Sequence, residues 1–166
     1  MIKFLAFSLL FVMTACTKVH NKIILNKKPD DMLIGYCKLP EFEQGDYAKW
    51  YEAEYNSYNV SEQDLATLIP VINEVDILIV MGTWCGDSRR EFPRFIKILD
   101  TLNYPKEKLR ILAVDRTKSI DEEGYKKLKI QFVPTIIISR VGNEIGRIVE
   151  SPKVSLERDL FEIIVP

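Results

Sequence analysis

The sequence predicts an α/β fold with a central mixed β-sheet flanked by helices and an N-terminal helical extension. A continuous apolar run at residues 77–81 and two apolar-rich segments at residues 109–114 and 135–139 have the length and composition of buried strands. Segments with helical periodicity lie between them. A hairpin signal at residues 141–143 leads into residues 144–149, which indicates an antiparallel pair. Helices between strands are expected to cover both faces of the sheet.

Composition limits the kinds of function that need consideration. The 166 residues suffice for one domain with a hydrophobic core and are too few for two of ordinary size. A net charge of -1 gives no overall field that would favour nucleic acid. One histidine and three cysteines make a closed zinc site hard to assemble. We therefore expect no nucleic acid partner, no metal and no cofactor.

Residues 1–15 have the features of a signal peptide. Lys3 supplies a positive charge, and residues 4–13 form an apolar run too short to span a bilayer as a helix. The run ends in Met-Thr-Ala-Cys, which resembles the lipobox of bacterial lipoproteins. That resemblance implies cleavage before Cys16 and acylation of this cysteine. The alternative is plain secretion, since Met13 is an unusual residue at the first lipobox position.

The rest of the chain divides into a tether, an extension and a main domain. We expect residues 16–31, with four lysines, to be a lipidated cysteine and polar tether, residues 32–75 to be a helical extension, and residues 76–166 to be the main domain. Aromatic residues at helical spacing within residues 45–59 predict a helix that packs against the sheet. Ser61 is expected to cap a second helix, with apolar positions Leu65, Leu68, Ile69 and Ile72.

Three further helices are expected in the main domain. One follows a turn at residues 82–86 and carries apolar residues as far as Leu99. A short helix is expected over residues 121–128. Ser155 is expected to cap the last helix. We expect Arg89, Arg90 and Arg94 to form a solvated helix face.

The motif that carries chemistry is Trp-Cys-Gly-Asp-Ser at residues 84–88, where a buried strand gives way to a helix. Unpaired backbone N–H groups and the helix dipole stabilise an anion at this position. Cys85 is therefore expected to lose its proton more readily, and the thiolate is the nucleophile. Ser88 lies about one turn further on, where its hydroxyl is expected to donate to the thiolate. Asp87 acts against ionisation of the thiol.

This motif resembles the Trp-Cys-x-x-Cys corner of thioredoxins. Pro93 follows the cysteine at the family's spacing, and Val133-Pro134-Thr135 matches the segment that carries the family's cis-proline. The resemblance covers about residues 76–165. Within it, residues 84–150 are similar to small bacterial lipoprotein-type thioredoxin proteins. The resemblance implies a thioredoxin-like fold.

The resemblance also implies a role for each matching residue. Cys85 matches the attacking cysteine, and Trp84 matches the tryptophan that shields it. Pro134 matches the cis-proline that lies beside the sulfur and keeps a metal from binding there. Val133 matches the residue whose backbone pairs with an extended substrate.

Three departures from the family pattern bear on the mechanism. Ser88 replaces the resolving cysteine, Ile79 stands in place of a buried proton-shuttling aspartate, and Ile111 stands in place of its lysine partner. Release of a mixed disulfide then needs an external thiol or Cys37. Cys37 is either an ordinary packed thiol or a resolving cysteine that pairs with Cys85 in an oxidising compartment.

We expect a cell-envelope thiol–disulfide protein that acts through Cys85 alone. Its partners would be envelope proteins with cysteines or disulfides, which it reduces, isomerises or captures, and an external thiol reductant. Acylated Cys16 would hold it on a membrane, facing the periplasm. The alternative is a non-catalytic module that binds an extended peptide near Pro134.

Overall fold

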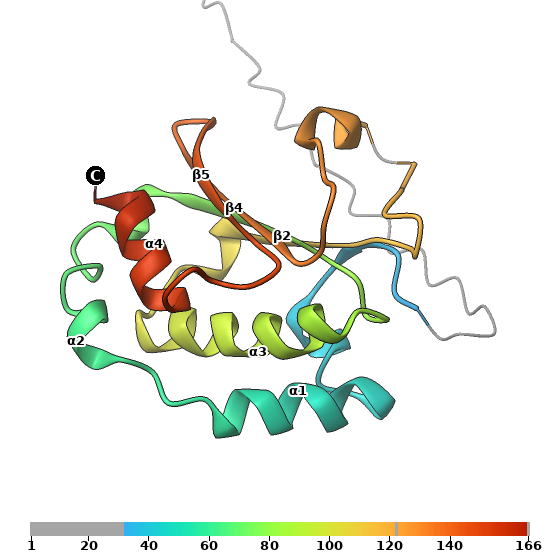
Figure 1. The fold of residues 1–166 in the computed structure, drawn as a ribbon, viewed down its shortest axis with the longest axis horizontal. Coiled ribbons are helices and arrows are strands. Elements are labelled where there is room, and N and C mark those ends of the chain that lie inside the picture. Colours follow the sequence, from blue (N-terminus) through green and yellow to red (C-terminus); the bar gives the residue numbers. More distant parts are fainter. Residues whose placement is uncertain (1–31, 122, 166) are drawn as a thin grey trace, which may run out of the picture.

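The apolar runs form the centre of a five-stranded sheet in the order β1-β3-β2-β4-β5 (Figure 1). The computed structural model describes residues 32–121 and 123–165. Strands β2 and β3 are parallel, whereas β1, β4 and β5 each run antiparallel to their neighbour. The predicted mixed sheet is thereby confirmed. The strands are β1 (Gly35–Cys37), β2 (Asp76–Met81), β3 (Leu109–Ala113), β4 (Thr135–Arg140) and β5 (Asn143–Val149).

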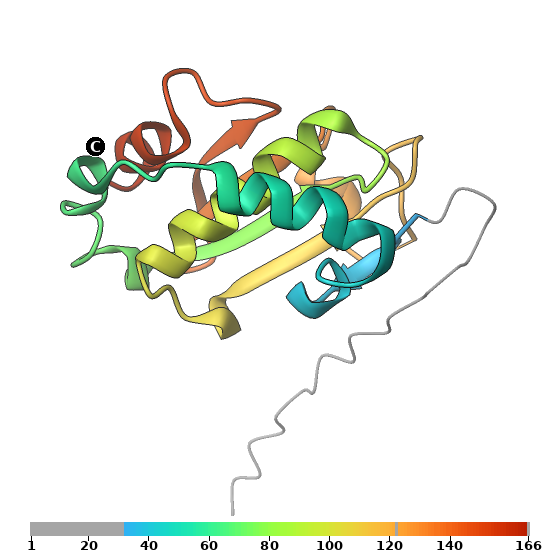
Figure 2. The same cartoon turned by 90° about the horizontal axis from the view of Figure 1, so that it is seen from below.

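Three helices lie on one side of the sheet. Helix α3 packs against the sheet. Figures 1 and 2 show α1 on the side of α3 that faces away from the sheet, with α4 beside them. The α-helices are α1 (Gly45–Ser57), α2 (Glu62–Leu65), α3 (Gly86–Thr101) and α4 (Leu156–Ile164). Single 3-10 turns are η1 (Leu39–Glu41), η2 (Ile72–Glu74), η3 (Lys106–Lys108) and η4 (Tyr125–Leu128). No helix in the described ranges combines the length and apolarity needed to cross a membrane.

Alternation along β2 explains why its sequence is apolar without a break. Ile77, Ile79 and Met81 are buried in the cluster that contains the apolar face of α3. Leu78 and Val80 point the other way and are buried with residues of the segment before β4. Both faces of the strand are therefore removed from water, as in other sheets covered on both sides.

The predicted aromatic stripe on α1 is part of the core, but it packs on α3 and not directly on the sheet. Phe42, which lies just before α1, is fully buried, and its ring centroid is 4.7 Å from that of Phe92 on α3. Tyr51 lies 5.9 Å from Phe92. The sheet face itself is occupied by α3, so α1 has only the outer side of that helix to cover.

Three elements differ from the sequence-based expectation. The segment expected to be helical also contributes β1, a short edge strand. The helix after Ser61 is a single turn followed by irregular turns up to Pro70, whose ring and missing N–H disfavour a longer helix. Residues 125–128 form a 3-10 turn, preceded by Gly124 at φ 82°, a conformation that an α-helix does not contain.

The two predicted serine caps have different outcomes. Ser61 stands at the N-cap of α2, but its side chain accepts no capping hydrogen bond, so that cap is not observed. The Ser155 hydroxyl accepts a hydrogen bond from the Arg158 N–H at 3.1 Å, so the cap of α4 is confirmed. The expectations for residues 1–31, including the signal peptide, Cys16 and the tether, lie outside the described residues.

The aromatic cluster predicts that the extension unfolds together with the sheet. Replacing Phe42 with Ala leaves a cavity between α1 and α3 and should cost about 3–5 kcal/mol in the free energy of unfolding. Chemical denaturation followed by tryptophan fluorescence measures this. Val154→Ala, at a position 74% exposed, is the control and should change stability by under about 0.5 kcal/mol. An unchanged main transition in Phe42→Ala would show that the extension contributes nothing to the core.

Candidate active site

The sulfur of Cys85 lies at the N-terminus of a 16-residue helix. Strand β2 ends at Met81, and a tight turn follows in which the Cys85 N–H donates to the Gly82 carbonyl at 2.9 Å. Cys85 has extended backbone angles and occupies the N-cap position of α3, and its carbonyl accepts from the Arg89 N–H at 3.0 Å. The unpaired N–H groups of the first turn therefore face the region of the thiol.

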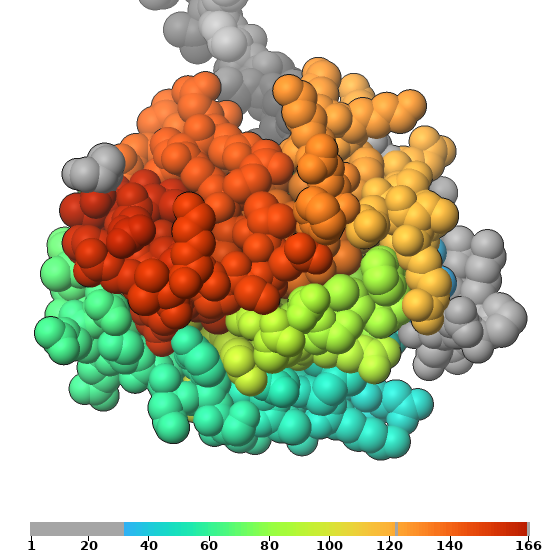
Figure 3. All heavy atoms as spheres, in the orientation of Figure 1, coloured from blue at the N-terminus to red at the C-terminus, as the bar shows by residue number. Residues whose placement is uncertain are grey.

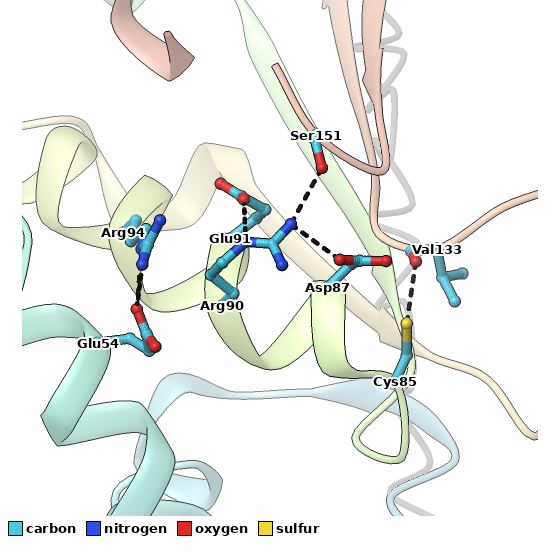
Figure 4. Close-up of polar contacts among 8 residues, drawn as sticks. All are labelled: Glu54, Cys85, Asp87, Arg90, Glu91, Arg94, Val133 and Ser151. Carbon is cyan, nitrogen blue, oxygen red and sulfur yellow. Dashed lines mark hydrogen bonds and ion pairs between the residues drawn. The ribbon is translucent and has the colours of Figure 1, made fainter.

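The thiol of Cys85 also contacts the segment that precedes β4. Its Sγ donates to the Val133 carbonyl at 3.2 Å (Figure 4). The Val133–Pro134 peptide bond is cis, and both residues are buried, whereas Cys85 is partly exposed. The structure thus brings together Cys85, Val133 and Pro134, as the sequence analysis expected.

Trp84 lies over the turn and covers one side of it. The indole Nε1 donates to the Val114 carbonyl at 2.9 Å, and the Arg116 guanidinium lies 5.5 Å from the ring centroid. A Cβ added at Gly82 would lie 2.7 Å from the indole. Gly82 is therefore needed for this position of Trp84. The sequence analysis did not single it out, although a glycine between an apolar run and a tryptophan was a visible signal.

Ser88 has a different contact from the one expected. It is fully buried, and its Oγ accepts a hydrogen bond from the Gly82 N–H at 3.2 Å. No hydrogen bond joins Ser88 to Cys85 among the described residues. The expectation that the hydroxyl donates to the thiolate is thus not met in this structure. Its observed role is to hold the start of the turn against the first turn of α3.

The two isoleucines that depart from the family pattern lie side by side. Ile79 and Ile111 are register partners on the parallel strands β2 and β3, with 0% and 3% of their surface exposed. Both belong to the apolar cluster under α3. These two positions therefore supply no acid or base to the thiol of Cys85.

The structure does not bring Cys37 to Cys85. Both thiols are free, and they pack with different apolar clusters on opposite faces of the sheet. The Cys37 Sγ donates to the Gly35 carbonyl at 3.4 Å. Burial, together with the nearby Glu41 carboxylate, raises the pKa of Cys37 to about 12. Cys37 therefore has the environment of a packed structural thiol.

The arginines of α3 do not form a simple solvated face. Arg89 donates to the Thr83 carbonyl at 2.6 Å, across the turn. Arg94 forms an ion pair with Glu54 of α1 at 2.6 Å, and Arg90 contacts three side chains near the site (Figure 4). Each of these arginines therefore joins α3 to a neighbouring segment. Among the described residues there is no group of three His, Cys, Asp or Glu side chains that could hold a metal ion.

Comparison with solved structures gives distant similarities. A protein of unknown function from Pseudomonas aeruginosa is 16% identical with a TM-score of 0.46, the match covering 67% of this chain and 65% of that one. This chain thus spans less than two thirds of that protein. Mitochondrial thioredoxin 3 from Saccharomyces cerevisiae is 23% identical with a TM-score of 0.39, the match covering 67% of this chain and 96% of that one. Comparison with curated protein sequences gives no match.

The family comparison covers most of the chain. The profile of the family described as Thioredoxin matches residues 40–159, a range that runs from the start of the extension into α4. It includes the turn with Cys85 and the segment with Pro134. The mixed sheet with flanking helices agrees with that match, although the α-helices lie on one face and not on both as expected. The chain belongs to the thioredoxin family.

Proposed function

We propose that this protein is a thiol–disulfide protein of the cell envelope that acts through one nucleophilic cysteine, Cys85. The observation that carries the proposal is the placement of its sulfur. Cys85 is partly exposed at the N-terminus of α3 and lies against the Val133 carbonyl beside Pro134. A thiol at a helix N-terminus is favoured as thiolate, and an accessible thiolate attacks disulfides.

The reaction is a thiol–disulfide exchange. The Cys85 thiolate attacks one sulfur of a partner's disulfide, a new S–S bond forms, and the partner's own S–S bond breaks. The second partner sulfur leaves as a thiolate and takes a proton from solvent. Cys85 and the attacked sulfur are then held in a mixed disulfide.

Release of that mixed disulfide requires a thiol from outside the site. Ser88 has no sulfur, and its hydroxyl is held by the backbone of Gly82. Cys37 lies on the opposite face of the sheet. An external thiolate that attacks the Cys85 sulfur frees the partner as a thiol and leaves Cys85 disulfide-bonded to the reductant. A second external thiol then restores the Cys85 thiolate and leaves with the first as a disulfide.

A non-catalytic binding module is the second candidate. The observation in its favour is the apolar pair Ile79 and Ile111, which leaves proton transfer at the site unassisted. In this case the surface beside Pro134 would bind an extended peptide through the backbone of Val133. Phe132, which is 46% exposed, would then offer an apolar contact next to that backbone.

The envelope location rests on the sequence before the described residues. The apolar run at residues 4–13 and the Thr-Ala-Cys that follows it support export and acylation, and the lysines after Cys16 suit an anionic lipid surface. Three acyl chains on one residue would exceed the two anchoring signals that stable attachment needs. Disulfides persist in such an oxidising compartment, which provides substrates for Cys85.

The two described thiols should differ strongly in reactivity. At pH 8 only about one Cys37 thiol in ten thousand is ionised if its pKa is about 12. Iodoacetamide should therefore modify Cys85 well before Cys37, and Cys37 should react only when the protein is unfolded or at very high pH. Peptide mass spectrometry at several times of reaction measures both rates. Faster modification of Cys37 than of Cys85 would remove the basis for assigning the nucleophile.

Mixed disulfides should accumulate without any engineering, because the site lacks a resolving cysteine. Purification from cell envelopes after rapid alkylation should recover partner proteins that dissociate on adding reductant. Cys85→Ser should recover none, whereas Cys37→Ala should behave as the wild type. Partners that bind equally well to Cys85→Ser and survive reductant would exclude the enzymatic proposal and favour the binding module.

The lipid anchor has a separate test. Growth with a labelled fatty acid should mark the wild-type chain and not Cys16→Ala, because the acyl groups attach at that residue. Cys37→Ala is the matched control and should remain labelled. Label on Cys16→Ala, or absence of label from the wild type, would contradict the anchor and leave plain secretion.

A further inference from the structure

A cluster of charged side chains surrounds the first turn of α3, and the proposed exchange reaction does not use it. Asp87 is the one acidic residue in that first turn. It lies two residues after Cys85, so its carboxylate and a thiolate would compete for the same helix N–H groups and repel each other. A free carboxylate here would work against the chemistry proposed for Cys85.

Arg90 holds that carboxylate from one turn further along the helix. Its Nη2 lies 2.8 Å from Asp87 Oδ1, a spacing of three residues at which helical side chains meet. The same guanidinium contacts Glu91 Oε1 through Nε at 2.6 Å and Ser151 Oγ through Nη2 at 3.0 Å (Figure 4). The Arg90 guanidinium thus has three partners, and Asp87 is one of them.

The contact with Ser151 joins α3 to the other half of the site. Ser151 follows β5, and the N–H of the preceding residue, Glu150, donates to the Pro134 carbonyl at 2.8 Å. The space-filling view shows the segment after β5 lying directly on α3 (Figure 3). Arg90 thus links the turn that carries Cys85 with the segment that holds Pro134.

We propose that Arg90 is a positioning residue for the thiol chemistry of Cys85. Arg90 draws the Asp87 carboxylate back along α3 and so keeps this carboxylate from opposing the Cys85 thiolate. This inference rests on the proposed function of Cys85. Glu91 is buried and already neutralises much of the guanidinium charge, so the main effect of Arg90 on the thiol passes through Asp87.

Other charged groups around Cys85 are tied to different partners. Arg89 donates to the backbone of Thr83. The guanidinium of Arg116 lies over Trp84, and the Lys118 ammonium lies 5.9 Å from the Phe132 ring centroid. Asp115 accepts from the backbone N–H groups of Thr117 and Ser119 in its own turn, and the Glu150 N–H donates to the Pro134 carbonyl.

The test measures the alkylation rate of Cys85 in the full-length chain as a function of pH, with the Cys85 peptide resolved by mass spectrometry. Arg90→Gln should slow alkylation of Cys85 about three- to tenfold at neutral pH, because the released carboxylate opposes the thiolate. Arg90→Lys should restore most of the rate. Arg94→Gln, the matched control about one helical turn further along α3, should leave the alkylation rate of Cys85 unchanged.

A second arm asks whether Arg90 acts through Asp87. In an Asp87→Asn background, Arg90→Gln should change the rate by less than about twofold. An equal fall in both backgrounds, or a Lys variant as slow as the Gln variant, would overturn the proposal and leave Arg90 a purely structural link. Alkylation needs no partner protein, so this result is independent of mixed-disulfide capture. Failure of capture alone would remove the proposed function and leave the coupling between Arg90 and Asp87 standing.

Discussion

The hydrogen bond from the Gly82 N–H to the hydroxyl of Ser88 holds the corner on which the whole site depends. It ties the last residue before the turn to the first turn of α3, inside a region from which water is excluded. A buried backbone N–H without a partner would destabilise that corner, so a hydroxyl at this position has a structural use. Trp84 covers the same corner because Gly82 has no side chain to displace it. The direction of α3 and the place of Cys85 both follow from this arrangement.

The surroundings of the two described thiols give them different chemistry. Both are partly buried, but Cys37 lies at the edge of the sheet beside the Glu41 carboxylate, and desolvation together with that charge raises the pKa of its thiol to about 12. Cys85 is reached by solvent and lies at the positive end of a helix dipole. The same residue type is thus a packing element at one position and a candidate nucleophile at the other. The difference comes from where the backbone places each sulfur.

Much of the fold was predictable because its strands are long apolar runs with clear breaks between them. The apolar run before Trp84 had to be buried on both faces, and the glycine turn after Thr135–Arg140 had to reverse the chain. The edge strand β1 was missed because three residues, Gly35–Cys37, carry no periodic signal and pair only through tertiary contact. The candidate site residues Cys85 and Pro134 were identified from their motifs. The contacts of Ser88 and Arg90 could not be predicted from the sequence. The contact of Ser88 depends on its side-chain rotamer, and one partner of Arg90, Ser151, lies far along the chain.

The two edges of the sheet affect how the protein behaves at high local concentration. An exposed edge strand invites pairing with a second molecule and leads towards aggregation. Here β1 is only three residues long, and β5 carries the Glu144–Arg147 ion pair and a register shift against β4 near Ser139. Short, charged or irregular edges make poor templates for a further strand. The two edges of this sheet therefore disfavour strand pairing between copies of the chain at high concentration.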